Sequence, residues 1–153
     1  MIIEDTNYIK EHIKEYQKLL GLDVSKNNIG LATTDTTLSL AFPLQTIKRT
    51  QFKTDIEKLK KIIAEENIFC LVIGFPYDGD GSKNERTQST KDFSNELLKY
   101  IDIPIFFQDE RFSTKMVKMT TKTSRKKEQS KSVDDQAAAW FLQIFIDKLN
   151  ISL

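Results

Sequence analysis

Short apolar runs and longer stretches with helical spacing alternate along this chain. Five runs have the length and composition of β-strands, and four stretches place apolar side chains on one face of a helix. The expected strands cover residues 19–23, 29–33, 38–47, 69–74 and 103–107. The expected helices cover residues 5–17, 53–66, 86–100 and 133–149. The polar segment 26–28 predicts a tight hairpin between the first two strands, because asparagine tolerates the positive φ of such turns.

The order of these elements predicts an α/β fold with a mixed five-stranded sheet. Three strands in succession favour an antiparallel meander, whereas the last two strands alternate with helices, as parallel crossovers do. The continuous apolar run at 69–74 is typical of a strand covered on both faces. We therefore expect helices on both faces of the sheet. Residues 1–18 are expected to form a helical N-terminal extension, and residues 19–153 a single domain.

Composition excludes several classes of protein. The chain has 153 residues, of which 39% are hydrophobic and 29% charged, as in one globular domain. One cysteine, Cys70, provides neither a disulfide framework nor a CxxC zinc site. No apolar run approaches the roughly 18 residues that a membrane helix needs. Acidic residues stand near the N-terminus where a signal peptide is basic, so a cytoplasmic protein without a membrane partner is expected.

Positive charge gathers in one segment of the chain. Residues 113–132 hold seven lysines and arginines against Glu128 alone, whereas the whole chain has a net charge of +1. Such a segment is typical of a polyanion-binding surface, and a solvated loop is the alternative. The candidate nucleic-acid contacts are Lys26, Arg111, Lys122, Arg125, Lys126, Lys127 and Lys131. Contacts of this kind position a phosphate backbone without reading its sequence. For Arg111, orientation of the neighbouring Glu110 is an equal alternative.

Three carboxylates occupy positions that structure alone does not require. Asp23 lies in an apolar run, where an ionised carboxylate is costly unless something pairs with it. Glu110 follows the last apolar run, at the kind of strand end where ligands gather in open α/β sheets. Asp134 starts the last helix and aligns with its apolar face. The structural alternatives are a satisfied strand-end aspartate, an ion pair with Arg111 and a favourable helix-dipole contact, respectively.

The neighbouring Asp135 has a different interpretation. It lies about 100° around the helix from Asp134 and three residues after Ser132, which is the spacing of a capping box. We therefore expect Asp135 to stabilise the start of the helix rather than to take part in chemistry.

Convergence of Asp23, Glu110 and Asp134 would require a positive charge among them. The only histidine, His12, is far away in the first helix, so an all-oxygen site for Mg²⁺ or Mn²⁺ is expected. Two such ions, about 3.5–4 Å apart, clamp the attacking and leaving oxygens of an in-line phosphoryl displacement. The residues thus favour a metal-dependent hydrolysis of nucleic-acid phosphodiesters that needs no protein nucleophile.

Four segments resemble the motifs of one family. Residues 22–32 (LDVSKNNIGLA) are similar to the first-strand signature of the YqgF family, also called RuvX, whose members are RuvC-like and Holliday-junction-resolvase-like. Residues 72–76 followed by 80–82 resemble its central strand and loop, and residues 109–114 (DERFST) resemble its DER motif. Val133 and Asp134, followed by two alanines, resemble its last helix. The resemblance covers about residues 19–147 and implies a ribonuclease H-like fold.

The resemblance also implies a function. It makes Asp23, Glu110 and Asp134 the catalytic, metal-binding acids of a nuclease, a hydrolase acting on ester bonds with two Mg²⁺ or Mn²⁺ ions. The implied role is trimming the 5′ end of pre-16S rRNA in ribosome biogenesis, with structured RNA as the partner of a monomer or weak dimer. The first alternative is a Holliday junction resolvase, which would act on branched DNA as a dimer.

The second alternative is a non-catalytic RNA-binding factor of ribosome assembly. It is favoured by Ser25, which stands where the family usually has glycine. An actin-like ATPase also starts with a strand of this type but needs two lobes, and 153 residues are too few for both.

Overall fold

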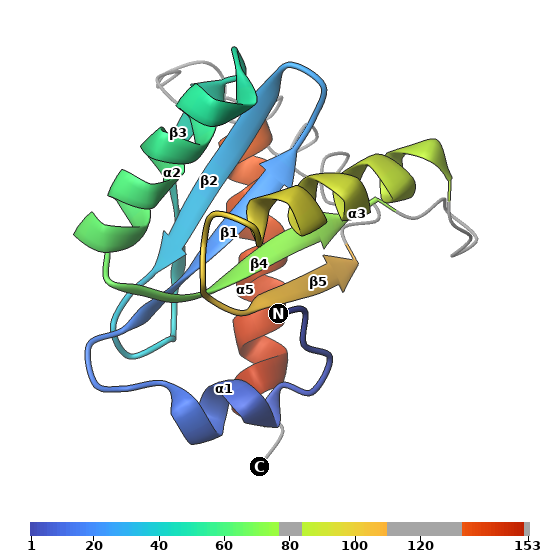
Figure 1. The fold of residues 1–153 in the computed structure, drawn as a ribbon. Helices are drawn as coiled ribbons and strands as arrows, with labels where there is room; N and C mark the ends of the chain where they lie inside the picture. Colours follow the sequence, from blue (N-terminus) through green and yellow to red (C-terminus); the bar gives the residue numbers. More distant parts are fainter. Residues whose placement is uncertain (77–83, 110–132, 152–153) are drawn as a thin grey trace, which may run out of the picture.

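The computed structural model of this chain describes residues 1–76, 84–109 and 133–151, which form a mixed sheet with helices on both faces (Figure 1). The strands are β1 (Lys18–Val24), β2 (Asn28–Thr34), β3 (Ala41–Lys48), β4 (Ile68–Phe75) and β5 (Ile105–Asp109). The helices are α1 (Asn7–His12), α2 (Phe52–Glu65), α3 (Glu85–Leu97) and α5 (Val133–Ile151). The sheet order is β3-β2-β1-β4-β5, with an antiparallel β1-β2-β3 meander and with β4 and β5 parallel to β1. The predicted α/β class and the mixed five-stranded sheet are therefore confirmed.

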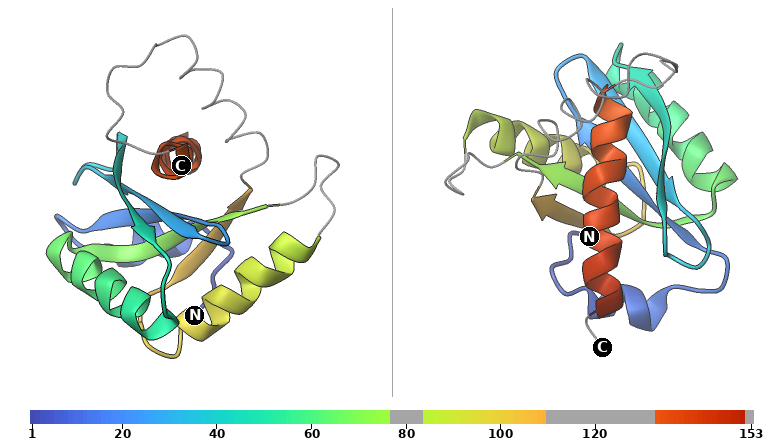
Figure 2. Two further views of the ribbon diagram at one scale, coloured as in Figure 1. Left: turned by 90° about the horizontal axis from the view of Figure 1, so that it is seen from above. Right: turned by 180° about the vertical axis from the view of Figure 1, so that it is seen from behind.

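Two apolar clusters hold the helices against the two faces of the sheet. Leu20 and Leu22 of β1 belong to the cluster that also contains buried residues of α2 and α3. Leu19 belongs to the other cluster, together with Phe141 and Phe145 of α5. Successive strand residues point to opposite faces, so the alternation along β1 separates the two layers. Figure 2 shows α5 on one side of the sheet and α2 and α3 on the other.

Two contacts show in which direction α5 runs across the sheet. In its first half and at its middle, Ala138 and Leu142 lie so close to Gly21 that a Cβ atom on Gly21 would be 3.2–3.3 Å from their atoms. Near its end, the Nδ2 atom of Asn150 donates a 3.0 Å hydrogen bond to the carbonyl of Leu38, in the β2–β3 turn. This turn lies at the edge where β1 begins, because β2 is antiparallel to β1. The first turn of α5 therefore lies at the carboxyl edge, where β1, β4 and β5 end.

The third strand begins at Ala41 rather than at the predicted residue 38. A tight turn precedes it, in which the Asp35 carboxylate accepts hydrogen bonds from the backbone N–H groups of Ser39 at 2.7 Å and Leu40 at 3.2 Å. Leu38 adopts a φ of 56°, in the left-handed region, and cannot belong to a strand. The prediction failed because the apolar side chain of Leu38 was assigned to the strand, although it belongs to the turn.

The first helix is also shorter than the predicted range of residues 5–17. It ends at His12, because the next residue, Ile13, has an extended ψ of 136°, and Tyr16 has a φ of 69° with 65% of its surface exposed. Ile9 is fully buried beneath α5, as the helical spacing predicted. The residues before this helix pair with β5, where the N–H of Ile3 donates to the carbonyl of Ile105 at 2.8 Å. The division into an extension, 1–18, and a domain, 19–153, stays a prediction.

The other strand and helix ends lie within three residues of their predicted positions. Cys70 is fully buried in β4, as expected for a residue of an apolar run covered on both faces. Among the helices of the described ranges, none has the length and apolar character needed to cross a membrane.

Candidate active site

Asp23 lies at the carboxyl edge of the sheet, one residue before the end of β1. Leu22 and Val24 point toward α2 and α3, so Asp23 points toward α5. Its side chain is only 4% exposed, which is unusual for an aspartate in a strand. The prediction of a buried carboxylate in the first strand is confirmed.

A row of positions crosses the sheet at the level of Asp23. Leu22 pairs with Ile73, so the next residue of β4, Gly74, is level with Asp23, and Gly74 in turn pairs with Gln108 of β5. The Cα atoms of Asp23 and Gln108 are therefore about 10 Å apart, two strand spacings. Gly74 has no side chain, so no side chain of β4 stands between the two polar groups at this level.

Gln108 was not predicted as a site residue. It is 8% exposed, and its Nε2 atom contacts the carbonyl of Asp109 at 3.4 Å. Phe106, two residues earlier, belongs to the cluster under α5, so Gln108 faces the same side. The only sequence signal is a polar residue directly after the apolar run 103–107, a position predicted to lie just beyond the strand.

The start of α5 lies near the level of Asp23. Asp23 is two strand residues beyond Gly21, or about 6.6 Å along β1. Asp134 is four helical residues before Ala138, or about 6 Å along α5 in the same direction. Because Gly21 and Ala138 are in contact, the backbones of Asp23 and Asp134 reach similar levels along the strand direction, toward the carboxyl edge.

The three predicted acids are thus only partly located. Asp23 is buried at the carboxyl edge, and the side chain of Asp134 is outside the described part of the chain. Glu110 also lies outside it, directly after Asp109, which ends β5. Within the ranges that the structure describes, no three acidic, histidine or cysteine side chains gather as metal ligands.

Asp135 is more deeply buried than its predicted capping role requires. Its side chain is 2% exposed and lies three and seven residues before Ala138 and Leu142, on the stripe of α5 that packs against β1. Its expected partner Ser132 is outside the described residues. The buried face of α5 therefore includes Asp135 as well as the apolar residues that the helical wheel predicts.

Ser25 closes the hairpin between β1 and β2. Its Oγ atom donates to the carbonyl of Asn28 at 3.0 Å and accepts from the N–H of Asn28 at 3.2 Å. Ser25 is not among the described residues with positive φ, so its backbone does not require glycine. The serine is therefore accommodated by the turn and does not distort the end of β1.

Of the predicted nucleic-acid contacts, the structure describes only Lys26, which is exposed at the hairpin. The other six, at positions 111, 122, 125, 126, 127 and 131, lie outside the described residues. Lys26 lines a groove of about 640 Å³ together with Arg49 and Arg86, two cations that sequence reasoning missed.

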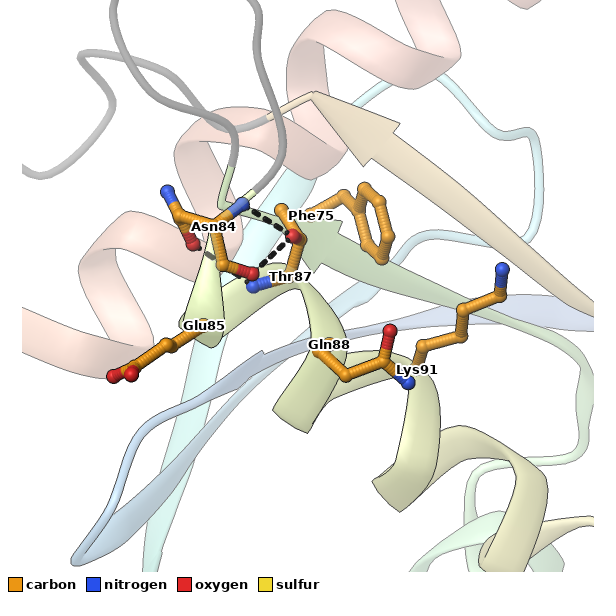
Figure 3. Close-up of a pocket in the computed structure, with 6 residues that line it drawn as sticks. All are labelled: Phe75, Asn84, Glu85, Thr87, Gln88 and Lys91. Carbon is orange, nitrogen blue, oxygen red and sulfur yellow. Dashed lines mark hydrogen bonds between the residues drawn. The ribbon is translucent and has the colours of Figure 1, made fainter.

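A smaller pocket of about 340 Å³ lies where β4 ends and α3 begins (Figure 3). Asn84 caps α3 by accepting from the N–H of Thr87 at 3.0 Å, and its own N–H donates to the hydroxyl of Thr87 at 2.8 Å. Its Nδ2 atom also donates to the carbonyl of Pro76 at 3.1 Å, which ties the start of α3 to the end of β4. Glu85 and Lys91, the charged residues among the described residues that line the pocket, point away from each other in this view.

Solved structures with similar folds include two that act on DNA junctions. The chain matches RuvC of T. thermophilus in complex with Holliday junction substrate with a TM-score of 0.55 and 11% identity, over 89% of this chain and 96% of that chain. It matches the Fowlpox virus resolvase with a TM-score of 0.51 and 12% identity, over 87% of this chain and 99% of the resolvase. At these identities the likeness shows the fold alone, and it confirms the predicted ribonuclease H-like, RuvC-like architecture.

Sequence relatives are much closer. A protein of Roseobacter denitrificans named "Putative pre-16S rRNA nuclease" is 40% identical over 99% of this chain and 95% of its own length. A protein of Paramagnetospirillum magneticum with the same name is 39% identical over 86% of each chain. The model of the RuvX family, described as Holliday junction resolvase, matches residues 17–148. The chain therefore belongs to the RuvX family, as the resemblance of its four motifs implied.

Proposed function

We propose that this chain is a divalent-metal-dependent nuclease that trims the 5′ end of pre-16S rRNA in the cytoplasm. The observation that carries the proposal is the buried carboxylate of Asp23 at the carboxyl edge, level with the first turn of α5. The names of the relatives from Roseobacter and Paramagnetospirillum support the substrate.

The donor chemistry of the site is compatible with hard cations. Asp23 supplies a buried carboxylate, and no cysteine or histidine of the described ranges lies at this edge to favour a softer metal. Asp23, Glu110 and Asp134 are the residues that would hold Mg²⁺ or Mn²⁺. Such ions supply an activated water and neutralise the departing oxyanion of a phosphodiester.

The described residues around Asp23 would prepare this chemistry. The close contact of α5 with Gly21 fixes the distance between the helix and β1, and hence the position of Asp134 relative to Asp23. Gly74 places no side chain of β4 at this level, and α5 covers the same face and would limit the access of bulk water from that side. Lys26, at the hairpin beyond Asp23, would contact the phosphate backbone of the RNA.

The proposal is tested by a cleavage assay on a pre-16S rRNA fragment and a four-way DNA junction side by side. The assay compares wild type with Asp23→Asn, each with Mg²⁺, Mn²⁺ or EDTA. Loss of a metal-binding carboxylate should reduce metal-dependent cleavage of the RNA by more than about 100-fold, beyond the effect of outer-shell changes. Undiminished cleavage by a folded Asp23→Asn protein would refute the mechanism.

A matched control is Asp102→Asn, which also removes one carboxylate. Asp102 is exposed between α3 and β5, away from the carboxyl edge of the sheet. Its replacement should leave cleavage unchanged, which separates a specific role of Asp23 from the general effect of one negative charge fewer. Thermal unfolding of both variants establishes that each is folded.

Resolution of Holliday junctions is the second candidate, because the family model carries that description. It requires two active sites on one junction and hence a dimer. Cleavage of the junction but not of the RNA, by a protein with the solution mass of a dimer, would favour it over RNA trimming.

A further inference from the structure

A basic groove lies on the opposite side of β1 from the candidate active site. It is bounded by the end of β1, the connection between β3 and α2, and the first two turns of α3, and its volume is about 640 Å³. Its basic lining residues are Lys26, Arg49 and Arg86, and the hydroxyl groups of Ser25, Thr50 and Ser89 also line it. The described residues that line it include no acid. A polar groove with this charge suits an anionic ligand.

Arg49 is held in place at the centre of this groove. Its Nη1 atom donates a 2.7 Å hydrogen bond to the carbonyl of Ser25, and its guanidinium carbon lies 5.2 Å from the centroid of the Phe93 ring. The side chain thus bridges the end of β1 and α3, and it is half-buried. A planar guanidinium fixed in this way loses little conformational entropy when it binds a phosphate.

The turn that carries Arg49 is itself braced. The N–H and hydroxyl of Thr50 donate to the buried carboxylate of Asp55, at 3.2–3.3 Å and 3.1 Å. Asp55 is therefore occupied in the first turn of α2 and leaves the positive charge of Arg49 to the groove. Lys26 and Arg86 are exposed on either side, on the hairpin and on α3.

The groove and the candidate active site share one strand end. Val24 lines the groove, whereas Asp23, the preceding residue, points to the face that α5 covers. A nucleic-acid strand that passes over the carboxyl edge at β1 can therefore contact both. We propose that the groove of Lys26, Arg49 and Arg86 binds the sugar–phosphate backbone of the RNA substrate at a distance from the scissile bond. The proposal rests on the proposed function, because it places the same RNA on both faces of β1.

The experiment measures binding rather than cleavage, by fluorescence anisotropy with labelled poly(U) RNA in EDTA over a series of salt concentrations. Lys26→Gln and Arg86→Gln each remove one exposed cation. For a single strand, each lost phosphate contact lowers the slope of log K against log salt by about 0.7. The corresponding loss of affinity is about fourfold at roughly 0.15 M salt.

The matched control is Lys61→Gln, which removes an exposed lysine of α2 that does not line the groove. It should change neither slope nor affinity. Arg49→Gln should weaken binding at least as much as the two exposed replacements, and thermal unfolding shows whether it is folded. If Lys26→Gln and Arg86→Gln bind like Lys61→Gln, the groove is not an RNA site.

The outcomes also separate this inference from the nuclease proposal. If wild type cleaves RNA while the groove variants bind and cleave normally, the groove inference fails and the nuclease stands. If no metal supports cleavage but the groove variants bind RNA more weakly, the groove stands and the chain is an RNA-binding factor.

Discussion

Replacement of Gly21 by alanine tests how closely α5 must approach β1. The added methyl group would lie 3.2 Å from Cβ and 3.3 Å from Cδ2 of Leu142, and 3.3 Å from the carbonyl oxygen of Ala138. Carbon atoms prefer separations of about 3.5–4.0 Å, so the methyl group would be a few tenths of an ångström too close to its neighbours in α5. The carbonyl belongs to the helix backbone, so the whole helix has to shift.

The cost follows from two opposing effects. Insertion of a methyl group into a packed core costs about 1–3 kcal/mol. Replacement of glycine by alanine also stabilises the folded state by about 0.4–1 kcal/mol, because it lowers the conformational entropy of the unfolded chain. The net expectation is a loss of about 1–2 kcal/mol in the free energy of unfolding. For a chain of this length, that lowers the Tm by roughly 2–8 °C. Urea denaturation and thermal unfolding of Gly21→Ala measure both values.

A double-mutant cycle identifies the contact responsible. Leu142→Ala removes Cδ2 and gives α5 more freedom to adjust, so Gly21→Ala should cost less in that background, with a coupling of at least about 0.5 kcal/mol. A shift of α5 also moves Asp134 relative to Asp23, so cleavage should fall although no acid has changed. A Gly21→Ala protein as stable as wild type, with additive effects in the cycle, would refute the close approach as a constraint.

Three further predictions concern single side chains. Burial raises the pKa of the Cys70 thiol, so the folded protein should react with a thiol reagent such as DTNB only after unfolding, and rapid labelling of folded protein would contradict this. Burial opposes ionisation of Asp35, but hydrogen bonds from Thr37, Ser39 and Leu40 lower its pKa below the ordinary value of an aspartate. Asp35→Asn should therefore destabilise at neutral pH and progressively less as the pH falls below the ordinary pKa of an aspartate, whereas an equal loss in urea titrations at every pH would refute this interpretation. At the start of α5, Asp134→Asn should abolish cleavage with little change in stability. Asp135→Asn should mainly lower the free energy of unfolding, because Asp135 is buried against the sheet. The reverse pattern in paired cleavage and unfolding assays would transfer the catalytic role to Asp135.

Much of the fold could be predicted because burial and periodicity coincide. The run at 69–74 is covered on both faces, and its apolar sequence alone predicts a buried strand. The turn before β3 could not be predicted in this way, because it depends on three hydrogen bonds to the Asp35 side chain. Leu38 is apolar yet has a positive φ, so its hydrophobicity pointed to the wrong element.

The candidate site was also predictable only where local sequence determines it. The burial of Asp23 could be predicted because the residues on either side of it, 19–22 and 24, are all apolar. The groove could not, because Arg49 and Arg86 are far apart in the sequence and meet only where α3 packs beside the β3–α2 connection. The burial of Asp135 could not be predicted from its spacing to Ser132, because a capping-box pattern does not say which face of the helix packs against the sheet.

Three consecutive residues at the end of β1 have different roles. Asp23 points toward α5, Val24 points into the basic groove, and Ser25 closes the hairpin through its hydroxyl group. Arg49 is bonded to the carbonyl of Ser25, so the groove and the hairpin are held as one unit. RNA bound in the groove would therefore contact the same rigid segment that positions Asp23. A phosphate contact on one face of the sheet can thus align a scissile bond on the other face without any movement of the strand between them.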